Sequence, residues 1–210
     1  MTQQHLLCAQ VTAPPIPDWL LELADQTLLD DQAKPNHWGV WDQANPENKK
    51  IDRMLLTRLG KTSKNGVNKY YYLDNKCVDW AKQNIDANIF DMRITTTDPG
   101  CQHKGPHKDL SRQWTGIYVL KSGGPENQTC WYKDKNLPGL DCPAGHVVTD
   151  YDQVDTICCV RLIPYQWYLL NSNILHGVEN INQGRKTLQF SLNDISTLSL
   201  FNTITTQFDQ

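Results

Sequence analysis

The chain has 210 residues, of which 39% are hydrophobic and 20% are charged, and its formal net charge is −3. This composition indicates a folded globular chain rather than a disordered one. The mildly acidic balance, with a pI of about 6.0, provides no basic footprint for nucleic acid or for an anionic membrane, so neither partner is expected.

The seven cysteines form an odd, scattered set without a CxxC pair. Such a set argues against a disulfide framework and for a reducing compartment. The first residues, MTQQHLLCAQ, show no basic segment followed by an apolar run, and no apolar stretch approaches the length of a membrane span. We therefore expect a cytoplasmic protein without membrane association.

The first part of the chain is predicted to be mainly helical. Helical spacing of apolar residues follows start signals in PDWLLELADQTLL (17–29), PENKKIDRMLLTRLG (46–60) and DNKCVDWAKQNI (74–85). Between the last two, SKNGVNKYYYL (63–73) has an Asn-Gly turn signal and then an aromatic run typical of a strand.

From about residue 88 the hydrophobic period changes toward two. Strands are predicted in ANIFDMRITT (87–96), TGIYVL (115–120), DTICCVRLI (155–163), YQWYLL (165–170) and RKTLQFSL (185–192). Short strands that follow a block of helices favour a sandwich or barrel with helices packed on one face. We expect one α+β domain over residues 1–210, in which 1–87 are mainly helical support, 88–195 are the β-core and 196–210 are a C-terminal tail.

The stretch GPHKDLSRQW places His107 and Asp109 two residues apart, directly after Pro106. In an extended chain, residues i and i+2 project to the same side, so both side chains could face one metal ion. The alternative is that the tripeptide lies on a solvated loop, since a motif this short has low specificity.

A second stretch, YLLNSNILHGVENINQGRKTLQFSL, supplies a possible third ligand. His176 follows an apolar strand and a turn, and Arg185 opens another strand nine residues later. Two imidazoles and one carboxylate on one face of an octahedron leave the opposite face open. This facial triad suits iron(II) that binds oxygen and an organic co-substrate together.

The strand that begins at Arg185 is polar on one face, which carries Arg185, Thr187, Gln189 and Ser191. An inward polar face is costly unless something polar is bound there. Arg185 could pair with a carboxylate and Thr187 could donate a second hydrogen bond to it. The alternative is the solvent face of an edge strand.

Together, PHKDLSRQWTGIYVL and PYQWYLLNSNILHGVENINQGRKTLQFSL resemble the iron(II)- and 2-oxoglutarate-dependent oxygenases, which have a double-stranded β-helix (a jelly-roll, cupin-like core), an HxD…H triad and a late arginine. The segment GGPENQTCWY is similar to small members related to prolyl hydroxylases. The resemblance implies that His107, Asp109 and His176 hold iron(II).

The same resemblance implies that Arg185, helped by Thr187, binds the distal carboxylate of 2-oxoglutarate. Tyr118 is a further candidate for that carboxylate or, equally, a core tyrosine. Arg112 and Trp114 could line a substrate pocket or have structural roles.

The implied activity is that of a dioxygenase that hydroxylates an amino acid, a peptidyl side chain or another small molecule, with O2 consumed and succinate and CO2 formed. The Asp109 carboxylate leaves no ligand position for a halide, which favours hydroxylation over halogenation. Two alternatives stay open: a metal oxygenase that does not use 2-oxoglutarate, and a non-catalytic cupin-like binding module.

Overall fold

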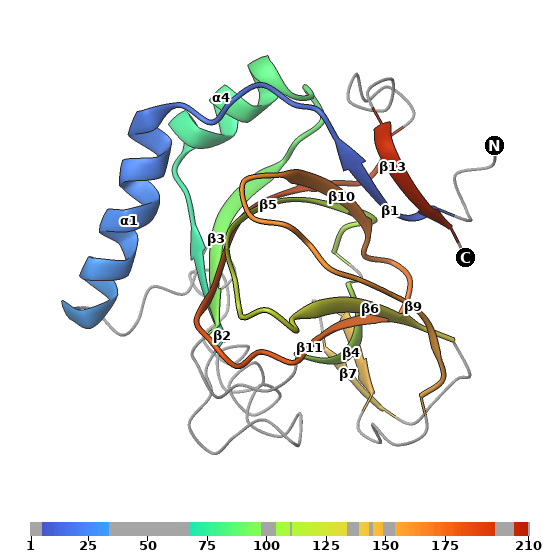
Figure 1. Cartoon of the computed structure of the whole chain (residues 1–210). Coiled ribbons are helices and arrows are strands. Elements are labelled where there is room, and N and C mark those ends of the chain that lie inside the picture. The colour runs from blue at the N-terminus through green and yellow to red at the C-terminus, as the bar shows by residue number, and fades with distance from the viewer. Residues whose placement is uncertain are drawn as a thin grey trace.

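Two antiparallel sheets make up most of the computed structural model, which describes residues 6–33, 68–97, 104–109, 111–133, 139–142, 145–148, 154–195 and 204–209 (Figure 1). The seven-stranded sheet has the order β13 (Ile204–Asp209), β1 (Leu6–Val11), β10 (Trp167–Asn171), β5 (Trp114–Ser122), β12 (Arg185–Leu192), β3 (Asp91–Thr97), β2 (Asn68–Tyr72). The six-stranded sheet has the order β7 (Gly139–Cys142), β8 (Gly145–Val148), β4 (Lys104–Asp109), β11 (His176–Glu179), β6 (Gln128–Tyr132), β9 (Thr156–Val160). This mostly antiparallel architecture is compatible with a β-sandwich or jelly-roll.

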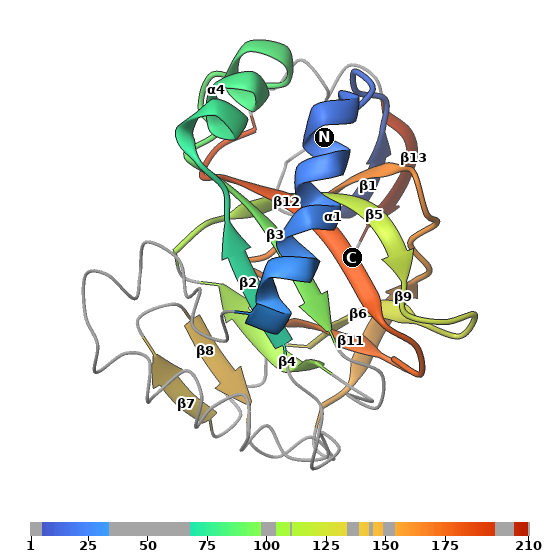
Figure 2. The same ribbon diagram turned by 90° about the vertical axis from the view of Figure 1, so that its left-hand side faces the viewer.

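Two helices, α1 (Asp18–Ala33) and α4 (Asn75–Asn84), lie against the outer face of the seven-stranded sheet (Figure 2). Alternate residues of β12, among them Leu188 and Phe190, pack with both helices in one buried cluster. Gly116 on the neighbouring β5 makes room for the Phe190 ring, because a Cβ atom there would lie 2.0 Å from the tip of that ring. The prediction of helices packed on one face of a β-core is confirmed.

A second apolar cluster lies between the sheets. It contains residues from both of them and includes Leu7, Ile117, Val119, Trp131, Tyr168 and Leu170. The core therefore has two layers, helix on sheet and sheet on sheet, and the inward face of β12 belongs to the second layer.

The predicted helices at 17–29 and 74–85 are confirmed. Asp74 caps α4 by accepting a hydrogen bond from the backbone N–H of Cys77 at 3.2 Å, as its place before an apolar-periodic run indicates. The helix predicted at 46–60 lies outside the described residues. Among the described residues, no helix combines the length and the apolar character that crossing a membrane requires.

The ends of the chain differ from expectation. β1, in the region expected to be mainly helical, pairs with β10 and with β13, and β13 lies in the region expected to be a tail. Two segments far apart in the sequence, β1 and β13, thus extend one edge of the seven-stranded sheet beyond β10 (Figure 1). Both faces of β1 are buried, and both carry apolar residues. The strand therefore lacks the alternation of apolar and polar residues by which a strand is predicted from sequence.

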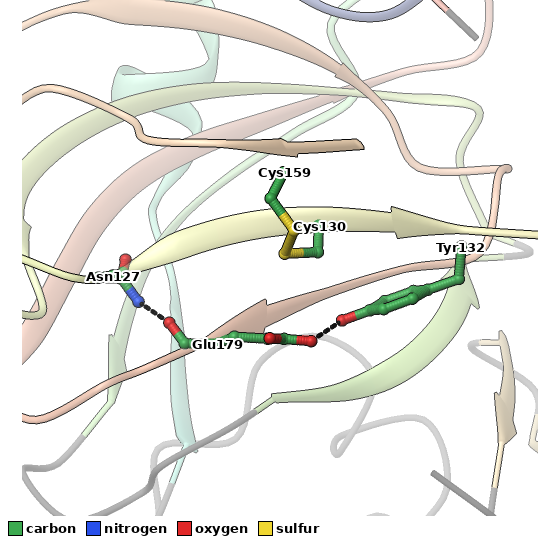
Figure 3. Close-up of a disulfide and its surroundings, with 5 residues drawn as sticks. All are labelled: Asn127, Cys130, Tyr132, Cys159 and Glu179. Carbon is green, nitrogen blue, oxygen red and sulfur yellow. Dashed lines mark hydrogen bonds between the residues drawn. A yellow bond between two sulfur atoms is a disulfide. The ribbon is translucent and has the colours of Figure 1, made fainter. Parts of the chain in front are cut away.

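The expectation of no disulfide is wrong for one pair. Cys130 on β6 and Cys159 on β9 are direct cross-strand partners and are joined by a disulfide (Figure 3). Strand register brings together two cysteines 29 residues apart, which a count of cysteines does not reveal. This disulfide removes the argument for a reducing compartment that the cysteine pattern gave. The cytoplasmic location stays a prediction.

Candidate metal centre

Cross-strand pairing brings the two histidines together. β4 and β11 are antiparallel neighbours in the six-stranded sheet, and His107 is the direct partner of His176. Side chains of directly opposed residues lie on the same face of a sheet. The two imidazole rings accordingly have their centroids 4.4 Å apart.

Asp109 joins them because it lies two residues beyond His107 on the same strand, and hence on the same face. Its Oδ2 is 4.0 Å from Nε2 of His176. One ligand atom from each of His107, Asp109 and His176 lies within 4.8 Å of the others. The described residues thus hold a candidate three-ligand metal site made by two neighbouring strands.

The backbone orients both imidazoles. Nδ1 of His107 is 2.8 Å from the carbonyl oxygen of Gly105, and Nδ1 of His176 is 2.9 Å from that of Ile174. Each ring therefore donates its Nδ1–H to a carbonyl two residues earlier, which leaves Nε2 with its lone pair for a metal. Such outer hydrogen bonds fix the tautomer and orientation of ligand histidines.

The protonation states also suit a divalent ion. Burial, with His107 as a neighbour, lowers the pKa of His176 from 6.5 to about 4, so this imidazole is neutral at pH 7. Burial alone would raise the pKa of Asp109, but the Arg112 guanidinium and the two histidines outweigh it and lower that pKa. Neutral imidazoles and an ionised carboxylate are the forms that bind metal.

Arg112 lies directly against the third ligand. Its Nη2 donates to Asp109 Oδ2 at 2.7 Å, and its Nε donates to the hydroxyl of Thr115 at 2.8 Å. The Thr115 hydroxyl is in turn 2.8 Å from that of Ser172. The Arg112 guanidinium thereby holds the Asp109 carboxylate on one side, and Thr115 of β5 holds the guanidinium by a hydrogen bond.

A cavity of about 50 Å³ lies beside the triad, between the two sheets. It is lined from the six-stranded sheet by His107, Asp109, Thr129, His176 and Val178, from the other sheet by Thr115, Ile117, Leu170, Arg185 and Gln189, and from the connecting loops by Arg112 and Ser172. A space of this size is large enough for a few water molecules and smaller than the roughly 300 Å³ at the lower end of small-molecule sites.

Arg185 enters the same cavity from the start of β12, and it is only 4% exposed. The turn before β6 helps to place it. Gly123 and Gly124 have φ of 96° and 122°, and the carbonyl of Gly123 accepts hydrogen bonds from the N–H groups of Asn182 and Gln183, just before Arg185. Glycine tolerates this left-handed conformation, which side chains rarely adopt.

The predicted polar face of β12 is inward. All eight residues of the strand are buried, and β12 lies between β5 and β3, so the alternative of a solvent-facing edge strand is wrong. Gln189, rather than Thr187, reaches the cavity wall. Its amide donates to the Thr187 hydroxyl at 2.9 Å and accepts from Nε of Arg93 at 3.1 Å. Thr187 therefore positions Gln189.

The structure does not bring Tyr118 to this cavity. Tyr118 is the cross-strand partner of Leu188, and its ring lies 5.2 Å from that of Trp167, in the cluster on the helix side of the sheet. Successive residues of a strand point to opposite faces, and on β5 it is Ile117 that faces the cavity. Tyr118 therefore points away from it. Trp114 likewise packs in the helix-side cluster, whereas Arg112 does line the cavity.

Several lining residues were not predicted from the sequence, and Thr129 is the one among them with a buried hydroxyl lacking a described partner. Thr129 is 2% exposed, and its hydroxyl makes no hydrogen bond with the described residues. It lies on β6 opposite Val178 of β11, the strand that runs from the triad toward the loop before Arg185. A buried hydroxyl without a partner is costly. Its segment, QTCWY, is too short and too apolar to reveal it in the sequence.

No protein-family model and no curated protein matches the chain. Among solved structures, a Pseudomonas putida prolyl-4-hydroxylase aligns over 90% of this chain and 94% of its own, with 13% identity and a TM-score of 0.47. A ribosomal oxygenase from Escherichia coli aligns over 51% of this chain and 24% of its own, with 15% identity and a TM-score of 0.34. A pumpkin pro-11S globulin aligns over 60% of this chain and 26% of its own, with 9% identity and a TM-score of 0.37.

The chain thus spans about a quarter of the length of the last two proteins. At TM-scores below 0.5 these superpositions are loose, and a function has to be inferred from the geometry of the site.

Proposed function

We propose that the chain is an iron(II)- and 2-oxoglutarate-dependent dioxygenase that hydroxylates an amino acid, a peptidyl side chain or another small molecule. It would form a single oxygenase domain on a double-stranded β-helix. One observation carries the proposal: His107, Asp109 and His176 converge beside a cavity that Arg185 also lines.

The residues present fit the proposed groups. Two neutral imidazoles and one carboxylate form the ligand set of a non-haem iron(II) site and leave positions for other ligands. Arg185 offers a fork of N–H donors that matches a carboxylate. Thr129 lines the same cavity, and its hydroxyl, which has no hydrogen-bond partner among the described residues, could donate to a bound oxygen atom.

When bound, iron(II) supplies the oxidative decarboxylation in which 2-oxoglutarate and O2 give succinate and CO2 while a C–H bond of the substrate is hydroxylated. His107, Asp109 and His176 would hold the ion, and Arg185 with Thr129 would orient the co-substrate. Thr187 and Arg93 would act through Gln189, which they hold by hydrogen bonds. The apolar wall of Ile117, Leu170 and Val178 would exclude water.

Because the cavity is about 50 Å³, a lining side chain has to move for the co-substrate to enter. Arg112 is the charged candidate that a loop rather than a strand carries, and its side chain is 14% exposed. Its contacts with Asp109 and Thr115 would change in that step.

The test is anaerobic reconstitution with iron(II) and 2-oxoglutarate. We expect a visible metal-to-ligand charge-transfer band, and succinate after oxygen is admitted. Arg185→Leu should still bind iron but form the band only at much higher 2-oxoglutarate concentration. His107→Ala should bind no iron.

Arg161→Leu is the matched control, because Arg161 is exposed and does not line the cavity. An iron-loaded protein that forms no band with 2-oxoglutarate would point to an oxygenase that does not use it. A protein that binds no iron would leave only a binding module.

A further inference from the structure

The edge strand β9 carries two cysteines in succession, Cys158 and Cys159, and only one of them is in the disulfide. Cys159 is joined to Cys130 of β6 (Figure 3), whereas Cys158 is a free thiol. The cross-strand partner of Cys158 is Trp131, a buried residue of the cluster between the sheets, and Cys158 packs against that cluster. Since successive residues of a strand point to opposite faces, Cys158 points into the sandwich and Cys159 out of it.

A second free thiol enters the same apolar layer from the other sheet. Cys8 lies on β1 and is completely buried in the cluster between the sheets. Its cross-strand partner on β10 is Leu170, which belongs to the same cluster and lines the cavity. Two free thiols from opposite sheets, those of Cys8 and Cys158, therefore contribute to one cluster.

The order of the strands places β9 over β1. β6 and β10 face each other across the sandwich, because Thr129 of β6 and Leu170 of β10 line one cavity. On the side away from the triad and β12, the next strand after β10 is β1, and the next strand after β6 is β9. Burial, with Cys158 as a neighbour, raises the pKa of the Cys8 thiol far above its usual range, in agreement with this placement.

The two thiols differ in their access to solvent. Cys158 is half-buried on an edge strand, so a dissolved oxidant meets it before it meets the buried Cys8. Stacked sheets lie about 10 Å apart, whereas a disulfide joins Cα atoms about 5–7 Å apart, so β9 has to move inward by a few ångströms. Among the described strands only β6 pairs with β9, and their register shifts between Trp131 and Tyr132. An edge strand with such an irregularity can make this movement.

We propose that Cys8 and Cys158 are a redox-sensitive pair that a low-molecular-weight disulfide, such as oxidised glutathione, converts into a bond between the two sheets. The Cys158 thiolate attacks one glutathione sulfur, so that the glutathione S–S bond breaks, a mixed disulfide forms and one glutathione thiol leaves. The Cys8 sulfur then attacks the Cys158 sulfur and displaces the second glutathione. The two protein thiols lose two electrons, their two protons pass to the glutathione sulfurs, and one glutathione disulfide becomes two thiols.

This bond would tie the two sheets together beside the candidate metal centre, next to Leu170 of the cavity wall. The loop that it closes, from Cys8 to Cys158, is far longer than the one closed by the existing disulfide, whose cysteines are 29 residues apart. Stabilisation by a disulfide rises with the length of the closed loop. The alternative is that both cysteines serve only as small apolar residues, which is the ordinary role of a buried free cysteine.

The test is oxidation of the folded full chain with oxidised glutathione, followed by alkylation of the remaining thiols, digestion without reductant and mass spectrometry of the peptides. We expect glutathione to appear first on Cys158. A peptide pair linked through Cys8 and Cys158 should follow, two hydrogen atoms lighter than the two thiol peptides together. The melting temperature should rise by roughly 5 °C or more. The same treatment in concentrated urea should show no preference for this pair, because the fold no longer places the two thiols together.

Cys158→Ser and Cys8→Ala should lose both the linked peptide and the rise in melting temperature. Cys77→Ala, which removes a buried thiol of α4 on the helix side of the sheet, is the matched control and should keep both. If Cys8→Ala does not fold, Cys158→Ser decides. A lasting mixed disulfide on Cys158 with Cys8 still a thiol, a bond from Cys158 to Cys130 instead of Cys8, or an equal rise in the melting temperature of Cys158→Ser would overturn the inference.

Discussion

At the scale of the residue, the candidate metal centre is organised by very short-range contacts. His107 and His176 each hydrogen-bond a carbonyl only two residues away, so each strand orients its own histidine. The strand pairing then has only to place two pre-oriented rings opposite each other. The third ligand, Asp109, is oriented differently. It is held by the side chain of Arg112 rather than by a backbone carbonyl, and Arg112 also hydrogen-bonds Thr115.

The first prediction concerns pH. The pKa of His176 is about 4 in the folded chain against 6.5 in the unfolded one, so the unfolded chain binds more protons between these values. Stability of the metal-free protein should therefore be highest above pH 6.5 and fall as the pH drops toward 4. Urea unfolding in EDTA would show this, and the slope over that window should be shallower in His176→Gln. Parallel curves for the two proteins would contradict the prediction.

The second prediction concerns Thr129. Thr129→Val keeps the shape of the side chain and removes a buried hydroxyl that has no partner among the described residues. The free energy of unfolding should stay the same or rise by up to about 1 kcal/mol, whereas 2-oxoglutarate should bind several-fold more weakly. Urea unfolding and titration of the charge-transfer band measure the two effects. Thr156→Val, on an exposed position of β9, should leave 2-oxoglutarate binding unchanged.

At the scale of the element, β12 serves two layers at once. Its even-numbered residues pack against the helices, and its odd-numbered residues face the other sheet and the cavity. On the helix side, β12 also contributes a buried charge, Lys186, that is paired with a carboxylate of a helix. Its side chain is 4% exposed, and its ammonium donates to Asp25 of α1 at 2.7 Å.

Removal of that carboxylate gives the third prediction. Asp25→Asn leaves a buried ammonium without its counter-charge, which should lower the free energy of unfolding at pH 7 by about 1 kcal/mol, because Asp25 itself is exposed to screening. Lys186 lowers the pKa of Asp25, so the wild type should lose this contribution as the pH falls below 3.8. Asp79→Asn, on an exposed position of α4, is the control and should change stability little.

The disulfide gives the fourth prediction, which also belongs to the scale of the element. β9 is an edge strand, and the Cys130–Cys159 bond ties it to β6. A loop of this length is worth about 2–4 kcal/mol. Reduction, which the exposed Cys159 permits, should lower the melting temperature of the wild type. Cys130→Ala/Cys159→Ala should already melt lower and be insensitive to reductant, whereas Cys158→Ser should respond as the wild type does.

At the scale of the whole molecule, the site belongs to neither sheet alone. The triad lies on the six-stranded sheet, while Arg185 and Gln189 lie on the other. Ligands that bridge them should therefore stabilise the sandwich as a unit. The hydrogen bonds of Glu179 with the Tyr132 hydroxyl and the Asn127 amide join β11 to β6 and to the residues just before it (Figure 3).

Ligand linkage gives the fifth prediction. Manganese(II), a redox-stable stand-in for iron(II), should raise the stability of the folded protein, by about 2.7 kcal/mol at one hundred times its dissociation constant. Addition of 2-oxoglutarate should raise the melting temperature further, because it would contact both sheets. Arg185→Leu should respond to the metal and much less to 2-oxoglutarate. An increment from 2-oxoglutarate without metal would contradict this order.

Local spacing alone determined much of this protein. The apolar period predicted α1, α4 and five of the strands, because their apolar residues recur at helical or strand spacing. The polar alternation from Arg185 to Ser191 predicted an inward polar face, and the HxD spacing placed His107 and Asp109 on one side of a strand. Each of these properties depends on neighbours in the sequence, which a single chain displays directly.

Tertiary structure decided everything that depends on register between distant strands. It paired His107 with His176, joined Cys130 to Cys159, turned Tyr118 away from the cavity and placed Thr129 in its wall. A shift of one residue in pairing reverses the face of every side chain. That register is set by the packing of the two sheets as a whole, so no local pattern contains it.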